Sequence, residues 1–156
     1  MTEAKKKVLT PMQKTYRFMQ RVQSIDDVID RKQEQIDSLR SLATSTEMHT
    51  DSERVQSSGA KDKIGDACAR IADLQAEINE DIDHLVEMKA SVMHRIDELE
   101  SLDERNVLFY RYFQYYEFRK ISQEMHVSES TVYRLHKQAM QGICENMFSN
   151  AAQSVS

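Results

Sequence analysis

The sequence predicts an all-α protein, on three observations. The chain has 3 glycines and 1 proline in 156 residues, too few for a fold rich in turns and strands. It is 30% charged and 40% hydrophobic, a balance typical of long amphipathic helices. Apolar residues also recur at strict intervals of seven, which indicates a coiled-coil seam. We therefore expect a long antiparallel helical hairpin of coiled-coil character, followed by a small C-terminal helical domain.

The first helix is predicted to begin at Thr10 and Pro11, after a basic N-terminus of residues 1–9 that we expect to be flexible. Proline suits the first helical position because its missing N–H would have no partner there. Lys32 interrupts the apolar face of this helix. The other positions of that face follow a heptad-like spacing and are Phe18, Val22, Ile25, Ile29, Ile36 and Leu39.

Residues 44–62 are polar and rich in Ser and Thr, and Gly59 lies among them. We interpret them as a mobile loop or a fraying helix end. The second helix then carries the strict repeat, at Ile64, Ile71, Ile78, Leu85, Val92 and Leu99. The intervening position of several heptads is filled by Leu74, Met88 and Leu102, and Ile82 and Ile96, one residue later, indicate an apolar stripe wider than a strict seam.

Such a stripe must be covered, either by the first helix folded back within residues 10–100 or by a second copy of the chain. Lys32 and the polar loop reduce the apolar surface that the first helix can pack against this stripe. We therefore expect a homodimer held by the helical N-terminal region.

The C-terminal domain is predicted to span residues 101–148, with a flexible tail at 149–156. Ser101 and Glu104 match the S-x-x-E capping box, although one uninterrupted helix through this point is the alternative. Three apolar helical faces follow, formed by Val107, Leu108, Tyr112 and Phe113, by Ile121 and Met125, and by Val132, Leu135, Ala139, Met140 and Ile143. Among the clustered aromatic residues, we expect Tyr112, Phe113 and Phe118 to fill the core rather than to stack on nucleic acid.

Between the last two faces lies a tight break, in which Ser128 is a good N-cap. A short helix, a turn of three or four residues and a longer capped helix form the recognition unit of the helix-turn-helix motif. The sequence therefore predicts a helix from about Ser128 to Ile143 that enters the DNA major groove.

The segment YRYFQYYEFRKISQEMHVSESTVYRLHKQAM also resembles region 4 of the sigma-70 family. The chain is similar to small sigma-region-4-like regulators of phages and prophages of Gram-positive bacteria, including the ArpU-like type and a phage family with an N-terminal helical hairpin. The resemblance implies control of phage gene expression, with host RNA polymerase as a possible partner. The matching positions are Arg111, Tyr112, Ile121, Ser122 (alanine in the usual pattern), Met125, Val127, Ser128, Thr131, Val132, Arg134, Ala139 and Met140.

Double-stranded DNA is the expected ligand. The net charge of −5 does not favour it, but the balance turns positive between Arg105 and Ile143. Arg134 can pair bidentately with guanine, and Arg119 and Lys120 begin the helix that crosses the phosphate backbone in this motif. The remaining candidate contacts lie near the start of the recognition helix and are Glu129, Ser130, Thr131, Tyr133 and Lys137.

Two alternatives to a DNA-binding regulator remain. A protein-interaction module of sigma-like fold would bind RNA polymerase or another regulator without reading DNA. A structural phage protein built on the coiled coil is the second.

The sequence gives no sign of an enzyme, because it has no nucleophile–base pair, P-loop or Gly-rich loop. The histidines follow no metal-ligand spacing, so neither metal nor cofactor is expected. Cys68 and Cys144 are expected to be reduced and buried. No apolar run is long enough to span a membrane and no secretory signal is apparent, so we expect the bacterial host cytoplasm.

Overall fold

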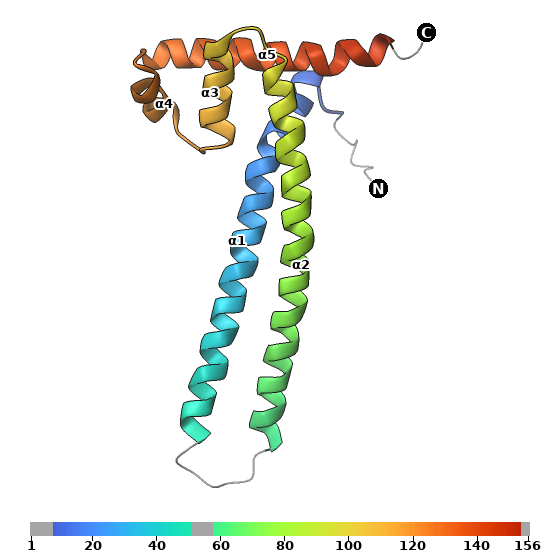
Figure 1. Ribbon diagram of the computed structural model, residues 1–156, viewed down its shortest axis with the longest axis vertical. Helices are drawn as coiled ribbons and strands as arrows, with labels where there is room; N and C mark the ends of the chain where they lie inside the picture. Colours follow the sequence, from blue (N-terminus) through green and yellow to red (C-terminus); the bar gives the residue numbers. More distant parts are fainter. Residues whose placement is uncertain (1–7, 51–57, 154–156) are drawn as a thin grey trace, which may run out of the picture. The chain divides into compact units, whose positions relative to one another are not determined.

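The computed structural model describes residues 8–50 and 58–153, and this part of the chain is all-α (Figure 1). Its helices are α1 (Pro11–Thr50), α2 (Ser58–Asp97), α3 (Leu102–Tyr112), α4 (Phe118–Met125) and α5 (Glu129–Gln153). The chain divides into two compact units, one of residues 25–86 and the other of residues 1–24 and 87–156.

Helix α1 begins where the sequence predicts. The Thr10 hydroxyl accepts a hydrogen bond from the Gln13 N–H at 3.2 Å, and the Gln13 side chain accepts one from the Thr10 N–H at 3.0 Å. These reciprocal bonds form a capping box around Pro11, and they satisfy N–H groups that the first helical turn leaves without partners.

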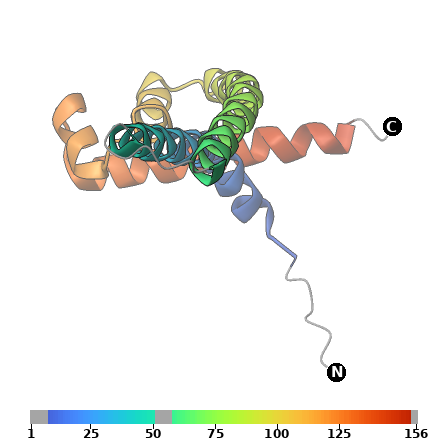
Figure 2. The ribbon, with the colours of Figure 1, turned by 90° about the horizontal axis from the view of Figure 1, so that it is seen from below.

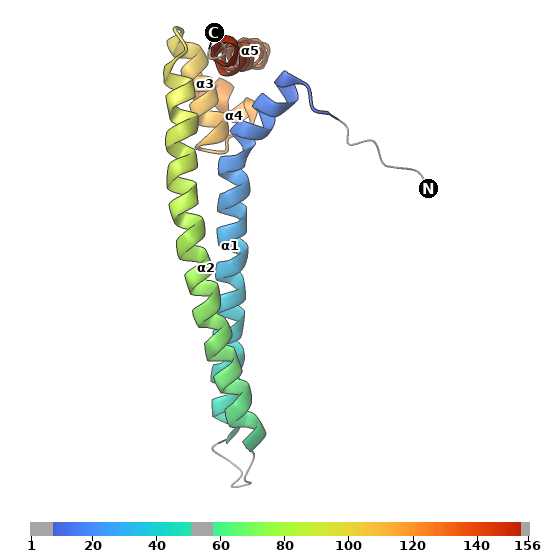
Figure 3. The same cartoon turned by 90° about the vertical axis from the view of Figure 1, so that its right-hand side faces the viewer.

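In the unit of residues 25–86, the parts of α1 and α2 run side by side in opposite directions (Figures 1 and 3). Ile36, Leu74 and Ile78 form its buried core. Lys32 does not leave a gap in this seam. Its ammonium lies 3.3 Å from a Glu77 carboxylate oxygen and also contacts Asp81, so two carboxylates of α2 neutralise the charge of Lys32.

The polar stretch 44–62 is more helical than expected. Helix α1 continues to Thr50 and α2 begins at Ser58, so only residues 51–57 of the expected loop lie outside the described chain. The hydroxyl groups of Thr44 and Ser45 donate to backbone carbonyls of the preceding turn, at 2.9 Å each. These bonds give the two polar side chains partners within the helix.

Some expected core positions are exposed. Ile82 is 43% exposed, so the buried stripe of α2 is narrower there than the sequence indicated. Leu102 is 66% exposed and belongs to α3 rather than to the α2 seam. Cys68 is exposed and Cys144 half-buried, so the expectation that both are buried was wrong.

The unit of residues 1–24 and 87–156 contains the start of α1, the end of α2 and all of α3, α4 and α5. The chain breaks at Ser101, whose hydroxyl accepts from the Glu104 N–H at 3.3 Å, as the capping box predicted. Helices α3, α4 and α5 then pack around the buried residues Val107, Ile121, Val132 and Leu135. Figure 2 shows α4 beside the N-terminal end of α5.

Candidate functional site

The connection between α4 and α5 is a tight, fully bonded turn. His126 ends α4 in the left-handed conformation, with φ 55°. Its N–H donates to the Gln123 carbonyl at 3.3 Å, and the Val127 N–H donates to the Ser122 carbonyl at 3.1 Å. This pair of bonds is the Schellman arrangement that closes a helix and reverses the chain. The turn therefore sets the angle at which α5 leaves α4.

Ser128 caps the start of α5, as its position predicted. Its hydroxyl oxygen accepts from the Thr131 N–H at 3.2 Å. The same oxygen lies 3.0 Å from the Ser130 hydroxyl and 2.9 Å from the Thr131 hydroxyl. Thr131 is half-buried, whereas Ser128 and Ser130 are exposed.

Helix α5 has one buried face and one polar face. Its buried face consists of the predicted apolar residues Val132, Leu135, Ala139, Met140 and Ile143. His136 is also buried, a placement that the sequence did not reveal. The candidate contacts on the first turns of α5 are solvent-exposed, namely Glu129, Ser130, Tyr133, Arg134 and Lys137.

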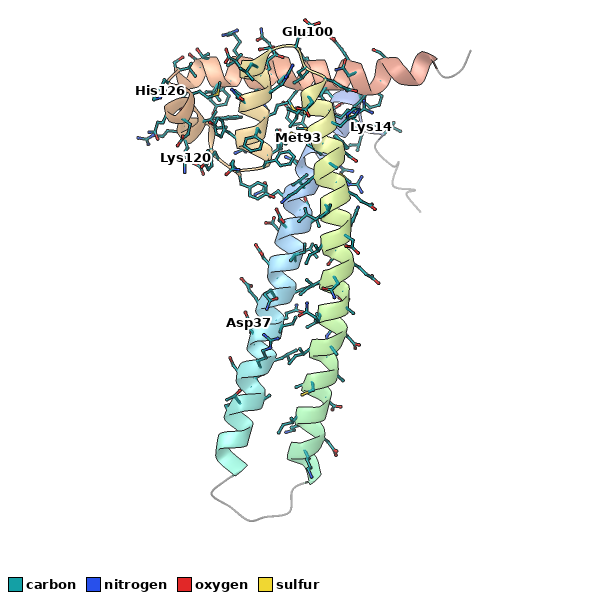
Figure 4. All side chains as sticks on the ribbon, in the orientation of Figure 1. Lys14, Asp37, Met93, Glu100, Lys120 and His126 are labelled. Atoms are coloured by element: carbon teal, nitrogen blue, oxygen red, sulfur yellow. The ribbon has the colours of Figure 1, made fainter. Side chains whose placement is uncertain are left out.

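The two candidate cations of α4, Arg119 and Lys120, are also exposed. The Lys120 ammonium lies 3.9 Å from the centre of the Tyr116 ring. Lys120 and His126 mark the two ends of α4 in Figure 4. The Phe118 ring, at the start of α4, lies 4.5 Å from the Tyr133 ring of α5. This aromatic contact brings the start of α4 next to the polar face of α5.

A buried polar pair lies under this surface. The Tyr112 hydroxyl is 3.0 Å from Nε2 of His136, and their rings stack at 5.8 Å between centres. Burial, and secondarily the nearby Arg111 guanidinium, lowers the pKa of His136 to about 4. Burial likewise raises the pKa of Tyr112 above its usual value. Both side chains are therefore neutral at physiological pH and act as a neutral hydrogen-bonded pair.

The start of α1 joins this site, which sequence reasoning missed. The Tyr16 ring lies 6.1 Å from the His136 ring. A cleft of about 550 Å³ opens beside this contact. Tyr16, Gln20 and Gln23 share one helical face, but this spacing alone indicates no partner elsewhere in the chain. The cleft is lined by Tyr16, Gln20, Gln23, Arg111, Tyr112, Phe118, Tyr133, His136 and Lys137.

Residues 8–50 and 58–153 contain neither a candidate metal site nor a candidate membrane-spanning helix. No group of three or more His, Cys, Asp or Glu side chains in this part could hold a metal ion. No helix there is both long and apolar enough to cross a membrane.

No curated protein matches the chain, and no solved structure does. Residues 42–143, more than half of the chain, match the family model described as "Protein of unknown function (DUF1492)". The matched region covers α2, α3 and α4 and the α5 residues discussed above. The chain therefore belongs to the DUF1492 family.

Proposed function

We propose that this protein is a DNA-binding transcriptional regulator in which α4 and α5 form a helix-turn-helix and α5 reads the major groove. One observation carries the proposal: after a tight turn, the capped first turns of α5 expose a polar face while the opposite face is buried against α3 and α4. A helix held in this way can enter a groove without disturbing its own core.

The exposed side chains suit two kinds of contact. Arg134 extends from the polar face of α5, where a guanidinium can pair with the O6 and N7 atoms of guanine. Arg119 and Lys120 lie at the start of α4, the helix that crosses the backbone in this motif, and suit phosphate. We therefore assign sequence readout to α5 and positioning to α4.

The resemblance to sigma region 4 extends this proposal. We infer that residues 101–148 form a sigma-region-4-like domain and that residues 10–100 form a helical hairpin in front of it. The protein would then control phage genes in the bacterial cytoplasm, acting with host RNA polymerase.

A protein partner is the second candidate, and one observation favours it. Helix α3 exposes Leu102 and Phe109, seven residues apart and so on one helical face. The Phe109 ring is stacked against Phe113 at 5.7 Å, which holds it in a fixed position. An apolar surface of this kind suits a protein rather than DNA. RNA polymerase retained by the wild type, but not by a Phe109→Ser variant, would support this candidate.

We also propose that the protein is a homodimer. Ile82 and Val86 lie one turn apart on α2 and are 43% and 62% exposed. Ile82→Asp combined with Val86→Asp should reduce the mass measured by light scattering to that of a monomer, while His84→Asp, a change at an exposed position on the opposite face of the same helix, should not. A monomer mass for the wild type at tens of micromolar would remove the dimer from the proposal.

Selection from a random pool of duplexes tests the central proposal. The purified protein should enrich one sequence and bind it more tightly than a scrambled duplex in a gel shift at fixed salt. The Arg134→Ala variant should bind the enriched and the scrambled duplex about equally tightly, while its helical content stays that of the wild type. Failure of the wild type to bind any duplex would refute the proposal and leave the protein-interaction candidate.

A further inference from the structure

The cleft beside α5 has a chemical character that suits an anion. It is lined by the cations Arg111 and Lys137, by the amides of Gln20 and Gln23, and by aromatic rings, with no carboxylate in the lining. Arginine, lysine and glutamine side chains all donate hydrogen bonds to phosphate oxygens.

Arg111 is held in place before any ligand arrives. Its guanidinium donates to the Tyr116 carbonyl at 3.0 Å and lies 5.1 Å from the centre of the Phe118 ring. A planar guanidinium keeps further donors free when one N–H is engaged. Arg111 therefore supplies fixed positive charge at the inner wall of the cleft, whereas Lys137 is exposed at its edge.

The wall opposite α5 is the start of α1. Tyr16, Gln20 and Gln23 recur at intervals of four and three, so they lie on one face of that helix. Arg17 is exposed and lies one turn from Gln20. Residues 8–24 contain basic side chains but no acidic one, so nothing on this part of α1 opposes an approaching anion.

Tyr133 and Lys137 belong both to this cleft and to the polar face of α5. A duplex engaged by α5 would therefore bring its backbone to the mouth of the cleft. We propose that the cleft receives a backbone phosphate of that duplex, bound by Lys137, Gln20 and Gln23, and that the start of α1 is a second DNA-contacting element. This inference rests on the proposed function. Residues 16–23 lie outside the region 42–143 that matches the family model.

The test introduces negative charge on the α1 wall without altering the helix core. Gln20→Glu combined with Gln23→Glu should raise the Kd by roughly tenfold or more, for the selected and the scrambled duplex alike, because phosphate contacts carry no sequence information. Gln33→Glu combined with Gln35→Glu is the matched control, because it makes the same two changes at exposed positions of the same helix in the other unit. Its Kd should stay at the wild-type value.

A salt series on full-length protein gives an independent measurement. Lys137→Ala should lower the slope of log Kd against log salt by about 0.9, because the one cationic contact to the cleft phosphate is lost. Lys137→Arg should keep the slope, because it keeps the charge. These single exposed substitutions preserve the helix and so remain informative even if the double variant misfolds.

The outcomes separate the two proposals. If the wild type selects and binds a duplex, but the double variant keeps the wild-type Kd or Lys137→Ala keeps the wild-type salt slope, the cleft does not receive a phosphate and the proposed function stands. If the wild type binds no duplex, both proposals are wrong.

Discussion

Acidification should destabilise the unit that contains α3, α4 and α5. Part of the loss in its free energy of unfolding should come from protonation of His136 in the unfolded chain. Burial holds the pKa of His136 at about 4 in the folded chain, against 6.5 for an unperturbed histidine. Between these two values the unfolded chain binds the extra proton and the folded chain does not. The stability that His136 contributes is therefore fully present above about pH 6.5 and is lost as the pH falls toward 4.

The magnitude follows from the gap between the two pKa values. A gap of about 2.5 pKa units corresponds to a ceiling of about 3 kcal/mol. Between about pH 7.5 and about pH 5 the linkage relation gives a loss of about 2 kcal/mol in the free energy of unfolding. The groups around the imidazole are the Tyr112 hydroxyl, the Tyr16 ring and the Arg111 guanidinium, and none of them is a carboxylate that would stabilise the charged form.

Urea titrations followed by tyrosine fluorescence measure the loss in the free energy of unfolding of the unit that contains His136. The chain has no tryptophan, and its six tyrosines all belong to the unit of residues 1–24 and 87–156. They are Tyr16, Tyr110, Tyr112, Tyr115, Tyr116 and Tyr133.

The reference for these titrations is His136→Gln, which removes the titrating ring but keeps a polar partner for the Tyr112 hydroxyl. Carboxylates titrate in both proteins, so the difference between their pH profiles isolates His136. We expect the wild type to lose about 2 kcal/mol more than the variant over this range. Parallel pH profiles would refute the reasoning, because they would mean that His136 binds its proton equally well in the folded chain.

Two further predictions concern α5. Ser128→Ala should cost ~1 kcal/mol of stability in the same urea assay, because it leaves the Thr131 N–H without its 3.2 Å partner. Ser130→Ala, which removes a neighbouring exposed hydroxyl, should stay within about 0.5 kcal/mol of the wild type. In binding titrations at fixed salt, Arg134→Ala should weaken binding to the selected duplex by ~1–3 kcal/mol, and an unchanged Kd would exclude a base contact. Lys137→Ala should instead weaken the selected and scrambled duplexes about equally, and a loss confined to the selected duplex would contradict a phosphate contact.

The sequence was most informative where local interactions determine the structure. The caps at Ser101 and Ser128 each depend on residues within one helical turn, so their motifs were sufficient to predict them. The apolar face of α5 follows directly from its spacing, and all five of its predicted residues are buried. The all-α class follows from the same kind of pattern.

Predictions failed where burial depends on distant parts of the chain. Ile82 fits a widened apolar stripe, yet it is 43% exposed because the packed face of α2 passes through Ile78 and Leu85 instead. The Ser- and Thr-rich segment 44–62 was interpreted as a mobile loop or a fraying helix end, and its described residues 44–50 and 58–62 are helical, with Thr44 and Ser45 bonding back to the carbonyls of α1. A helix can thus accommodate residues whose average propensity favours turns.

The cleft was missed for the same reason. Tyr16 and His136 lie far apart in the sequence, and nothing in the local pattern of either helix indicates that their rings meet. The candidate contacts on α4 and α5 were found because they share one motif. Gln20 and Gln23 became candidates only when the structure brought α1 to the cleft.

Lys32 changes the argument for assembly. The sequence suggested that this lysine interrupts the seam and leaves apolar surface for a second copy. In the structure its ammonium contacts Asp81 and Glu77, and the hydrogen bond to Asp81 is the main reason that its pKa is raised. A lysine paired across the seam favours one register between α1 and α2 over its neighbours, because a shift would separate the charges. The core position Ile78 is already buried within a single chain, so a second copy would have to dock outside the seam, on the exposed flank of α2.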